Sequence, residues 1–170
     1  GTMSVGKTTL VNALKELEQF KGYKFATERS QHLMSLGIPL NTDSTLKGQT
    51  VFLAERCGEL MYNNIITDRT VLDVMAFTMN AKSIPHQDKE AFEVYASEFI
   101  REYDYIFYIS PHGLEIEDNG VRETDEHYRD LIDFTITTLI KRHGHKAGAI
   151  EKISGSTEER IQQILNVTKL

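Results

Sequence analysis

Gly1-Thr2-Met3-Ser4-Val5-Gly6-Lys7-Thr8 has the spacing G-x-x-x-x-G-K-[ST] of a phosphate-binding loop. In such a loop, backbone N–H groups surround the β- and γ-phosphates, the lysine reaches the phosphate oxygens, and the Thr8 hydroxyl can bind Mg²⁺. The alternative is a glycine-rich turn before an ordinary helix. We expect ATP and Mg²⁺ as cofactors. The residues predicted to hold the nucleotide are Gly1, Ser4, Val5, Gly6, Lys7, Thr8 and Thr9.

A phosphate-binding loop normally follows a buried β-strand in the middle of a parallel sheet. No residue precedes Gly1 in this sequence, so the expected first strand is missing from it. Its two neighbours in the sheet would then be unpaired, and the sheet core would be exposed. We therefore expect the sequence to be a truncated form of a longer chain.

Length and composition indicate one domain over residues 1–170. The net charge of −6, without a long basic tract, means that nucleic-acid binding is not predicted. No apolar run approaches the roughly 20 residues that span a bilayer, so no membrane segment is expected. The lone Cys57 excludes an internal disulfide and indicates a reducing, cytoplasmic location. A homo-oligomer is left open.

Apolar strand patterns alternate with helical patterns along the chain. Strands are expected at residues 23–27, 64–68, 105–109 and 149–153. Helices are expected at 7–20, 31–36, 71–81, 87–103, 129–143 and 158–167, with a longer one from a cap within 41–44 to about residue 61. This alternation predicts an α/β protein with a parallel sheet covered on both faces. Together with the phosphate-binding loop, it predicts a P-loop NTPase three-layer α/β/α sandwich.

Polar residues follow several of the expected strands, where ligands bind in open parallel sheets. Glu28, Asp68 and Ser110 should therefore border one crevice. Asp68 could hold Mg²⁺ together with Thr8, and Arg69 could hold a phosphate or organise the acceptor. The plainer interpretation is that Asp68 caps the next helix while Arg69 forms a surface salt bridge.

Glu28 ends the preceding strand, on the side where a second substrate would lie. Its carboxylate could accept the proton of an attacking hydroxyl. The alternative is a helix-capping glutamate beside Arg29.

Gln49 and Arg56 are two helical turns apart and share a helix face. The Gln49 amide could hydrogen-bond to the edge of a base, and Arg56 could hold a sugar hydroxyl or phosphate or brace the catalytic acid. The alternative is a pair of solvated polar residues.

The polar stretch at about 112–129 is predicted to be a lid. Arg122 and Arg129 could close over the transferring phosphoryl group, neutralise its charge and exclude water. The alternative is an acidic surface loop with arginines paired along a helix. The histidines show no metal-ligand grouping, so zinc is not predicted.

Taken together, these motifs resemble the P-loop kinase group of deoxynucleoside kinases, ribosylnicotinamide kinases and related small AAA-type domains. The segment Ile66-Thr67-Asp68-Arg69-Thr70 is similar to the acidic-Arg-Ser/Thr segment at a strand end of nucleoside kinases. Phe25-Ala26-Thr27-Glu28 matches the position of their catalytic carboxylate, and Gln49 with Arg56 repeats the spacing of a base-reading Gln and its partner Arg. Asn119-Gly120-Val121-Arg122 with Arg129 resembles the AAA-type lid, and 153–164 the closing strand and helix.

The resemblance implies an ATP-dependent phosphotransferase with a nucleoside, nucleotide or related small acceptor. Its catalytic residues would be Lys7, Glu28, Asp68, Arg69, Arg122 and Arg129. Its metal ligands would be Thr8 and Asp68. Its acceptor-binding residues would be Glu28, Gln49, Arg56 and Arg69. An ATP-hydrolysing switch or a nucleotide-binding regulator is the alternative, but no Asn-Lys-x-Asp motif is present and Arg69, not Glu, follows the second carboxylate.

Overall fold

The computed structural model describes residues 1–27, 30–112 and 125–170. Its strands are β1 (Lys24–Ala26), β2 (Ile65–Thr67), β3 (Tyr105–Ile109) and β4 (Ala149–Ile153). β1 pairs with β2 in parallel, with Phe25 opposite Ile66, and β3 pairs with β4 in parallel, with Phe107 opposite Glu151. The parallel strands that the alternating pattern predicts are confirmed.

Helices precede or follow each strand. The α-helices are α1 (Lys7–Lys15), α2 (Ser30–Ser35), α3 (Leu46–Glu59), α4 (Val71–Asn80), α5 (His86–Ser97), α6 (Glu126–His143) and α7 (Thr157–Thr168). Short 3₁₀ helices are η1 (Glu18–Phe20), η2 (Asn41–Asp43), η3 (Glu98–Glu102) and η4 (Gly144–Lys146). None of the helices in the described ranges is long and apolar enough to cross a bilayer.

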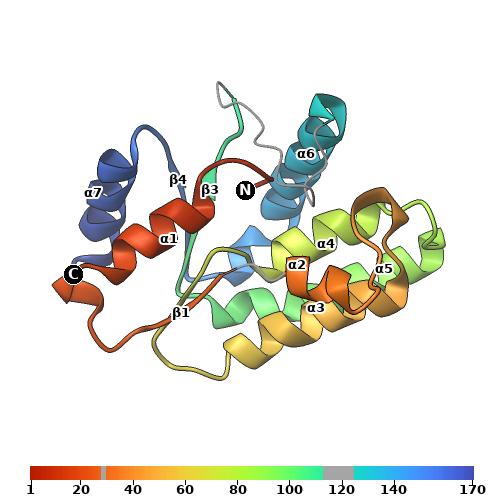
Figure 1. The fold of residues 1–170 in the computed structure, drawn as a ribbon, viewed down its shortest axis with the longest axis horizontal. Coiled ribbons are helices and arrows are strands. Elements are labelled where there is room, and N and C mark those ends of the chain that lie inside the picture. Colours follow the sequence, from red (N-terminus) through yellow and green to blue (C-terminus); the bar gives the residue numbers. More distant parts are fainter. Residues whose placement is uncertain (28–29, 113–124) are drawn as a thin grey trace.

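The helices form two layers with the strands between them. In Figure 1, α1 and α7 lie on one side of the strands, and α3, α4, α5 and α6 lie on the other. β3 contributes to both interfaces, because Ile106 and Tyr108 pack with α4 and α6 whereas Ile109 packs with α1, β4 and α7. This arrangement is the α/β/α sandwich expected from the sequence.

Some helix ends differ from the sequence prediction. α1 ends at Lys15, and the apolar pattern that continues to Phe20 belongs to the separate turn η1. α3 begins later than the 41–44 segment suggests, because the Thr45 hydroxyl accepts a hydrogen bond from the Gly48 N–H at 3.1 Å and caps the helix. Segment 41–43 forms η2 instead.

The two strand pairs do not meet. β2 and β3 face each other across a cavity of about 320 Å³, which side chains of both strands line together with Leu10, Leu14 and Ile164. Gly1 also lines this cavity. A parallel strand in this position would pair with both β2 and β3 and join the two strand pairs into one sheet.

Candidate active site

The loop before α1 has the backbone conformation that its glycine spacing predicts. Gly6 has φ +78° and Ser4 has φ +56°, so the chain turns sharply before α1 begins at Lys7. The N-terminal end of α1 thus opens toward the loop, and this end of a helix binds anions through its N–H groups and its dipole. Val5 is buried and anchors the loop in the core, whereas Gly6 and Thr9 are exposed.

The two glycines of the motif are each required by close neighbours. A Cβ on Gly1 would collide with the Ile109 carbonyl oxygen at the end of β3. A Cβ on Gly6 would lie 3.2 Å from Nη1 of Arg160, and its positive φ disfavours other residues in any case. The loop therefore lies in close contact with β3 on one side and with α7 on the other.

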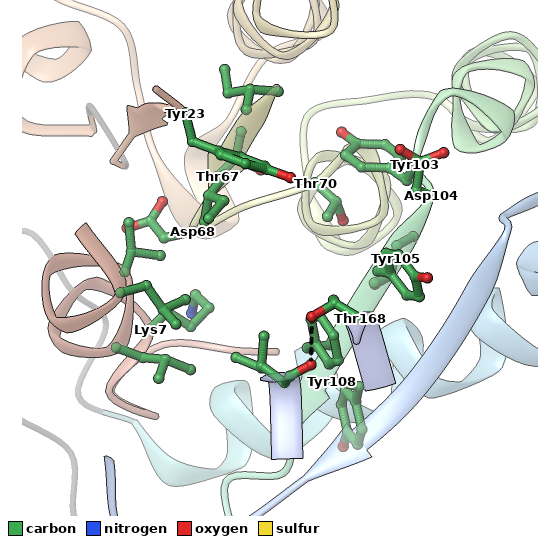
Figure 2. Close-up of a pocket in the computed structure, with 18 of the residues that line it drawn as sticks. Lys7, Tyr23, Thr67, Asp68, Thr70, Tyr103, Asp104, Tyr105, Tyr108 and Thr168 are labelled. Carbon is green, nitrogen blue, oxygen red and sulfur yellow. Dashed lines mark hydrogen bonds between the residues drawn. The ribbon is translucent and has the colours of Figure 1, made fainter. Parts of the chain in front are cut away.

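Lys7 and Asp68 lie on the same side of the cavity, opposite Tyr103, Asp104 and Tyr105 (Figure 2). Lys7 Nζ donates to the carbonyl oxygen of Thr2, so its ammonium group turns back toward the loop. A phosphate bound in the loop would therefore find this positive charge nearby.

Asp68 joins the loop to the end of β2. The Thr8 hydroxyl donates to Asp68 Oδ2 at 2.8 Å, and the Asp68 side chain is buried. Within the described ranges, Asp68 Oδ1 has no hydrogen-bond partner. A buried carboxylate oxygen without a donor, beside a threonine hydroxyl, suits Mg²⁺ with one or two protein ligands and further oxygens from phosphates and water. No group of three or more His, Cys, Asp or Glu side chains in the described part could hold a metal by itself.

The cap of α4 comes from Thr70 and Asp73, not from Asp68. Thr70 Oγ1 accepts from the Leu72 N–H at 3.2 Å, and Asp73 Oδ2 accepts from the Thr70 N–H at 2.8 Å. This capping box leaves the Asp68 carboxylate available to the loop, so the plainer interpretation of Asp68 as the helix cap is wrong.

Arg69 lies between β2 and α4 and is largely buried. Its Nη1 is 3.9 Å from Asp73 Oδ1, and its guanidinium lies 5.4 Å from the centre of the Phe77 ring. Burial alone would raise the pKa of Asp73, but the positive charges of Arg69 and Lys7 and the hydrogen bond from the Thr70 N–H act in the opposite direction, and that pKa lies below its usual value. Asp73 is thus an anion that Arg69 and Lys7 stabilise.

Two of the predicted acceptor-binding residues, Gln49 and Arg56, lie on α3 and are buried, which contradicts the interpretation of two solvated residues. Gln49 is 4% exposed and Arg56 is 3% exposed. Arg56 Nη2 is 2.8 Å from Glu59 Oε1, and its Nε and Nη1 have no hydrogen-bond partner in the part of the chain that the structure describes. Arg56 therefore keeps donors that a ligand oxygen could use.

Two further buried polar groups lie on α6. Arg129 is buried in the first turns of the helix, so the end of the predicted lid is helical there. The Tyr108 hydroxyl donates to Asp133 Oδ1 at 2.8 Å. Burial, and then the neighbouring Asp133 carboxylate, raise the pKa of Tyr108 above its usual value. Glu28, Arg122 and most of the 112–129 lid lie outside the described residues.

Sequence reasoning did not identify Asp73 or Arg160 as parts of this site. The sequence does contain a pattern that could have identified Asp73, because Thr70-x-x-Asp73 has the spacing of a capping box. No short sequence pattern could have identified Arg160. Its Nη1 donates to the Val5 carbonyl oxygen, and these two residues are 155 positions apart in the sequence.

A phosphate-binding loop at the start of a helix, beside a strand-end carboxylate and within a parallel α/β/α sandwich, defines a P-loop kinase-like NTPase. A family model described as AAA domain (AAA_28) matches residues 1–160, and the chain belongs to this family.

Solved structures of deoxyadenosine kinase from M. mycoides share the fold. One, with the products dCMP and a flexible dCDP bound, has a TM-score of 0.69 and 18% identity, covering 99% of this chain and 96% of that one. Another, with dCTP bound, has a TM-score of 0.67 and 19% identity over the same shares. No curated protein sequence matches the chain significantly.

Proposed function

We propose that the protein transfers the γ-phosphate of ATP to a nucleoside or nucleotide acceptor. The observation that carries this proposal is the hydrogen bond from Thr8 to Asp68, because it joins the phosphate-binding loop to a buried carboxylate at a strand end. P-loop enzymes hold Mg²⁺ between a loop hydroxyl and such a carboxylate. The fold shared with deoxyadenosine kinase supports phosphoryl transfer over hydrolysis alone.

In the proposed reaction, the acceptor hydroxyl oxygen forms a bond to the γ-phosphorus. The bond from that phosphorus to the β–γ bridging oxygen breaks, and ADP leaves with the electron pair. Glu28 accepts the hydroxyl proton. Lys7, Arg69, Arg122 and Arg129 neutralise charge on the transferring group, and Mg²⁺ bound by Thr8 and Asp68 supplies further neutralisation. Most of the catalysis would therefore come from positioning and electrostatics.

The acceptor would be recognised from α3. A buried Gln amide has a donor and an acceptor side by side, which fits the edge of a nucleobase. The unpartnered Nε and Nη1 of Arg56 would bind an oxygen of the sugar or phosphate. Because the similar kinase structures hold dCMP with dCDP, or dCTP, deoxycytidine and its phosphates belong among the acceptors to be tested.

The test is an assay of ADP release and of γ-phosphate transfer. The protein, with any residues that its gene encodes before Gly1, is incubated with ATP, Mg²⁺ and single nucleosides or nucleoside monophosphates. Mass spectrometry then identifies the phosphorylated acceptor. Lys7→Ala serves as the blank. We expect ADP release that rises strongly with one acceptor class and a product heavier by one phosphoryl group.

The AAA family description keeps a second candidate, an ATP-hydrolysing switch or regulator. The same assay separates the two. ADP release that is equal with every acceptor, without a phosphorylated product, would reject the phosphotransferase and favour the switch. Tight ATP binding without any turnover would favour the regulator.

A further inference from the structure

Arg160 connects the last helix of the chain to the phosphate-binding loop. It lies in the first turns of α7 and is 7% exposed. Its Nη1 donates to the Val5 carbonyl oxygen at 2.7 Å. The same nitrogen would lie 3.2 Å from a Cβ on Gly6, so the guanidinium fills the space behind this glycine. Arg160 therefore packs against the turn of the loop that leads into α1.

Contacts at the first turn of α7 hold the Arg160 side chain toward the loop. Ser156 and Glu159 form a capping box: Ser156 Oγ accepts from the Glu159 N–H at 3.2 Å, and Glu159 Oε2 accepts from the Ser156 N–H at 2.7 Å. Gly155 has φ +93° and allows the sharp turn from β4 into this cap. One turn along the helix, Ile164 packs into the same core as Val5. The cap and the core together fix the angle at which Arg160 approaches the loop.

The charge of Arg160 is not balanced by an acid in the described part of the chain. No carboxylate of residues 1–27, 30–112 or 125–170 forms an ion pair with it, and its Nε has no hydrogen-bond partner there. A buried cation without an anion is unfavourable for folding. The cost is offset when an anion binds nearby, and the loop beside Arg160 has the form of an anion site.

We propose that Arg160 is a positioning residue of the phosphate-binding loop. It holds the Val5 carbonyl turned away from the bound nucleotide, so that the loop N–H groups face the β-phosphate, and it adds a positive charge behind them. This inference rests on the proposed function, because it takes the ligand of the loop to be a nucleotide with at least two phosphates. It assigns to α7 a part in nucleotide binding.

The test compares Arg160→Met, Arg160→Lys and the wild type in binding ATP, ADP and AMP by calorimetry. Arg160→Met keeps the length of the side chain but loses the donor and the charge, so we expect about tenfold weaker binding of ATP and ADP. Binding of AMP, which has no β-phosphate, should change less than about twofold. Arg160→Lys keeps the charge, so it should recover part of the affinity for ATP and ADP.

A matched control on the same helix is Gln163→Met. Gln163 donates to the carbonyl oxygens of Ser154 and Glu159, so this substitution removes side-chain hydrogen bonds on α7 but leaves the Ser156–Glu159 cap and the contact of Arg160 with Val5 in place. Its affinities for ATP, ADP and AMP should equal those of the wild type. Hydrogen exchange of residues 4–8 without nucleotide is a second readout, and we expect faster exchange in Arg160→Met and unchanged exchange in Gln163→Met.

Several outcomes would overturn the inference. They are wild-type affinity for ATP in Arg160→Met, an equal loss of affinity for AMP and ATP, or loop exchange unchanged by the substitution. If Arg160→Met does not fold, the same comparison is made with Arg160→Lys, for which a smaller loss with the same order of ligands is expected. A wild-type protein that binds no nucleotide would reject the proposed function, and hydrogen exchange would then decide alone whether Arg160 positions the loop.

Discussion

The phosphate-binding loop and helix α3 would bind the two substrates in different ways. The loop offers mainly backbone groups, which two glycines shape and which Arg160 and Asp68 support from outside. α3 offers the side chains of Gln49 and Arg56, and Arg56 is already paired with Glu59. Backbone groups bind any nucleotide with the right phosphates, whereas side chains select among acceptors. We therefore expect changes in the loop to affect every reaction and changes in α3 to affect the choice of acceptor.

The largest effect is expected from Lys7→Ala. The ammonium group of Lys7 supplies positive charge inside the loop, and loss of one such group at a transferring phosphoryl group lowers kcat by about 10²–10³-fold. The loss should be the same with every acceptor, and it would be measured as ADP formation at saturating ATP. Lys15→Ala changes an exposed lysine at the end of the same helix and should leave the rate unchanged. A Lys7→Ala protein with near wild-type kcat would remove the loop from the mechanism.

The next effect is expected from Asp68→Asn. The amide keeps an oxygen that can accept the hydrogen bond from Thr8, but it lacks the negative charge that attracts Mg²⁺. We expect the Mg²⁺ concentration for half-maximal activity to rise by about 10–100-fold, with partial recovery at high Mg²⁺. Asp43→Asn, at an exposed aspartate, is the control. An unchanged Mg²⁺ dependence would show that Asp68 acts only in the structure.

The Gln49→Leu substitution tests whether α3 binds the acceptor. It removes the amide from a buried position, so the KM for a nucleoside acceptor should rise by about tenfold. The KM for ATP should stay the same, because the loop is not changed. Thr50→Ala is the control, since Thr50 is exposed on the same helix and its hydroxyl only donates to the Leu46 carbonyl. If KM for ATP and for the acceptor rise together, α3 does not discriminate between the two substrates.

Much of the fold could be predicted from the sequence because its signals are local. The strands at 105–109 and 149–153 have the predicted ends, since each is a short stretch bounded by polar or turn residues. The end of α1 could not be predicted in this way. Leu17 and Phe20 continue the helical spacing, but their burial comes from tertiary packing of a separate turn.

In the candidate site too, some contacts could be predicted from local sequence patterns and others depend on tertiary packing. Thr8 and Asp68 could be expected to meet, because the loop spacing places one and the end of a parallel strand places the other. The contact of Arg160 with Val5 depends on how α7 packs against α1 across the whole length of the chain, and no short pattern reports this. The pairing of Arg56 with Glu59 is local, but the burial of Arg56 on α3 depends on the neighbouring helices.

The smallest effect is expected from Asp73→Asn, which tests how much the Asp73 carboxylate stabilises the folded protein. Because the pKa of folded Asp73 is below its ordinary value of 3.8, its charge stabilises the fold above that pH, and this stabilisation is lost as the pH falls through the folded-state pKa. At pH 7 we expect Asp73→Asn to lower the free energy of unfolding by about 1–2 kcal/mol, through the weakened capping box and the lost attraction to Arg69.

Urea unfolding at pH 7 and at pH 3 measures this difference. The difference in unfolding free energy between wild type and Asp73→Asn should be smaller at pH 3, because this pH lies below the ordinary Asp pKa of 3.8, where the unfolded state binds a proton more readily than the folded state. Glu159→Gln weakens the corresponding capping box of α7, where the side chain is exposed, and its cost should be smaller. If the difference in unfolding free energy between wild type and Asp73→Asn is equal at both pH values, Asp73 acts through its hydrogen bonds alone.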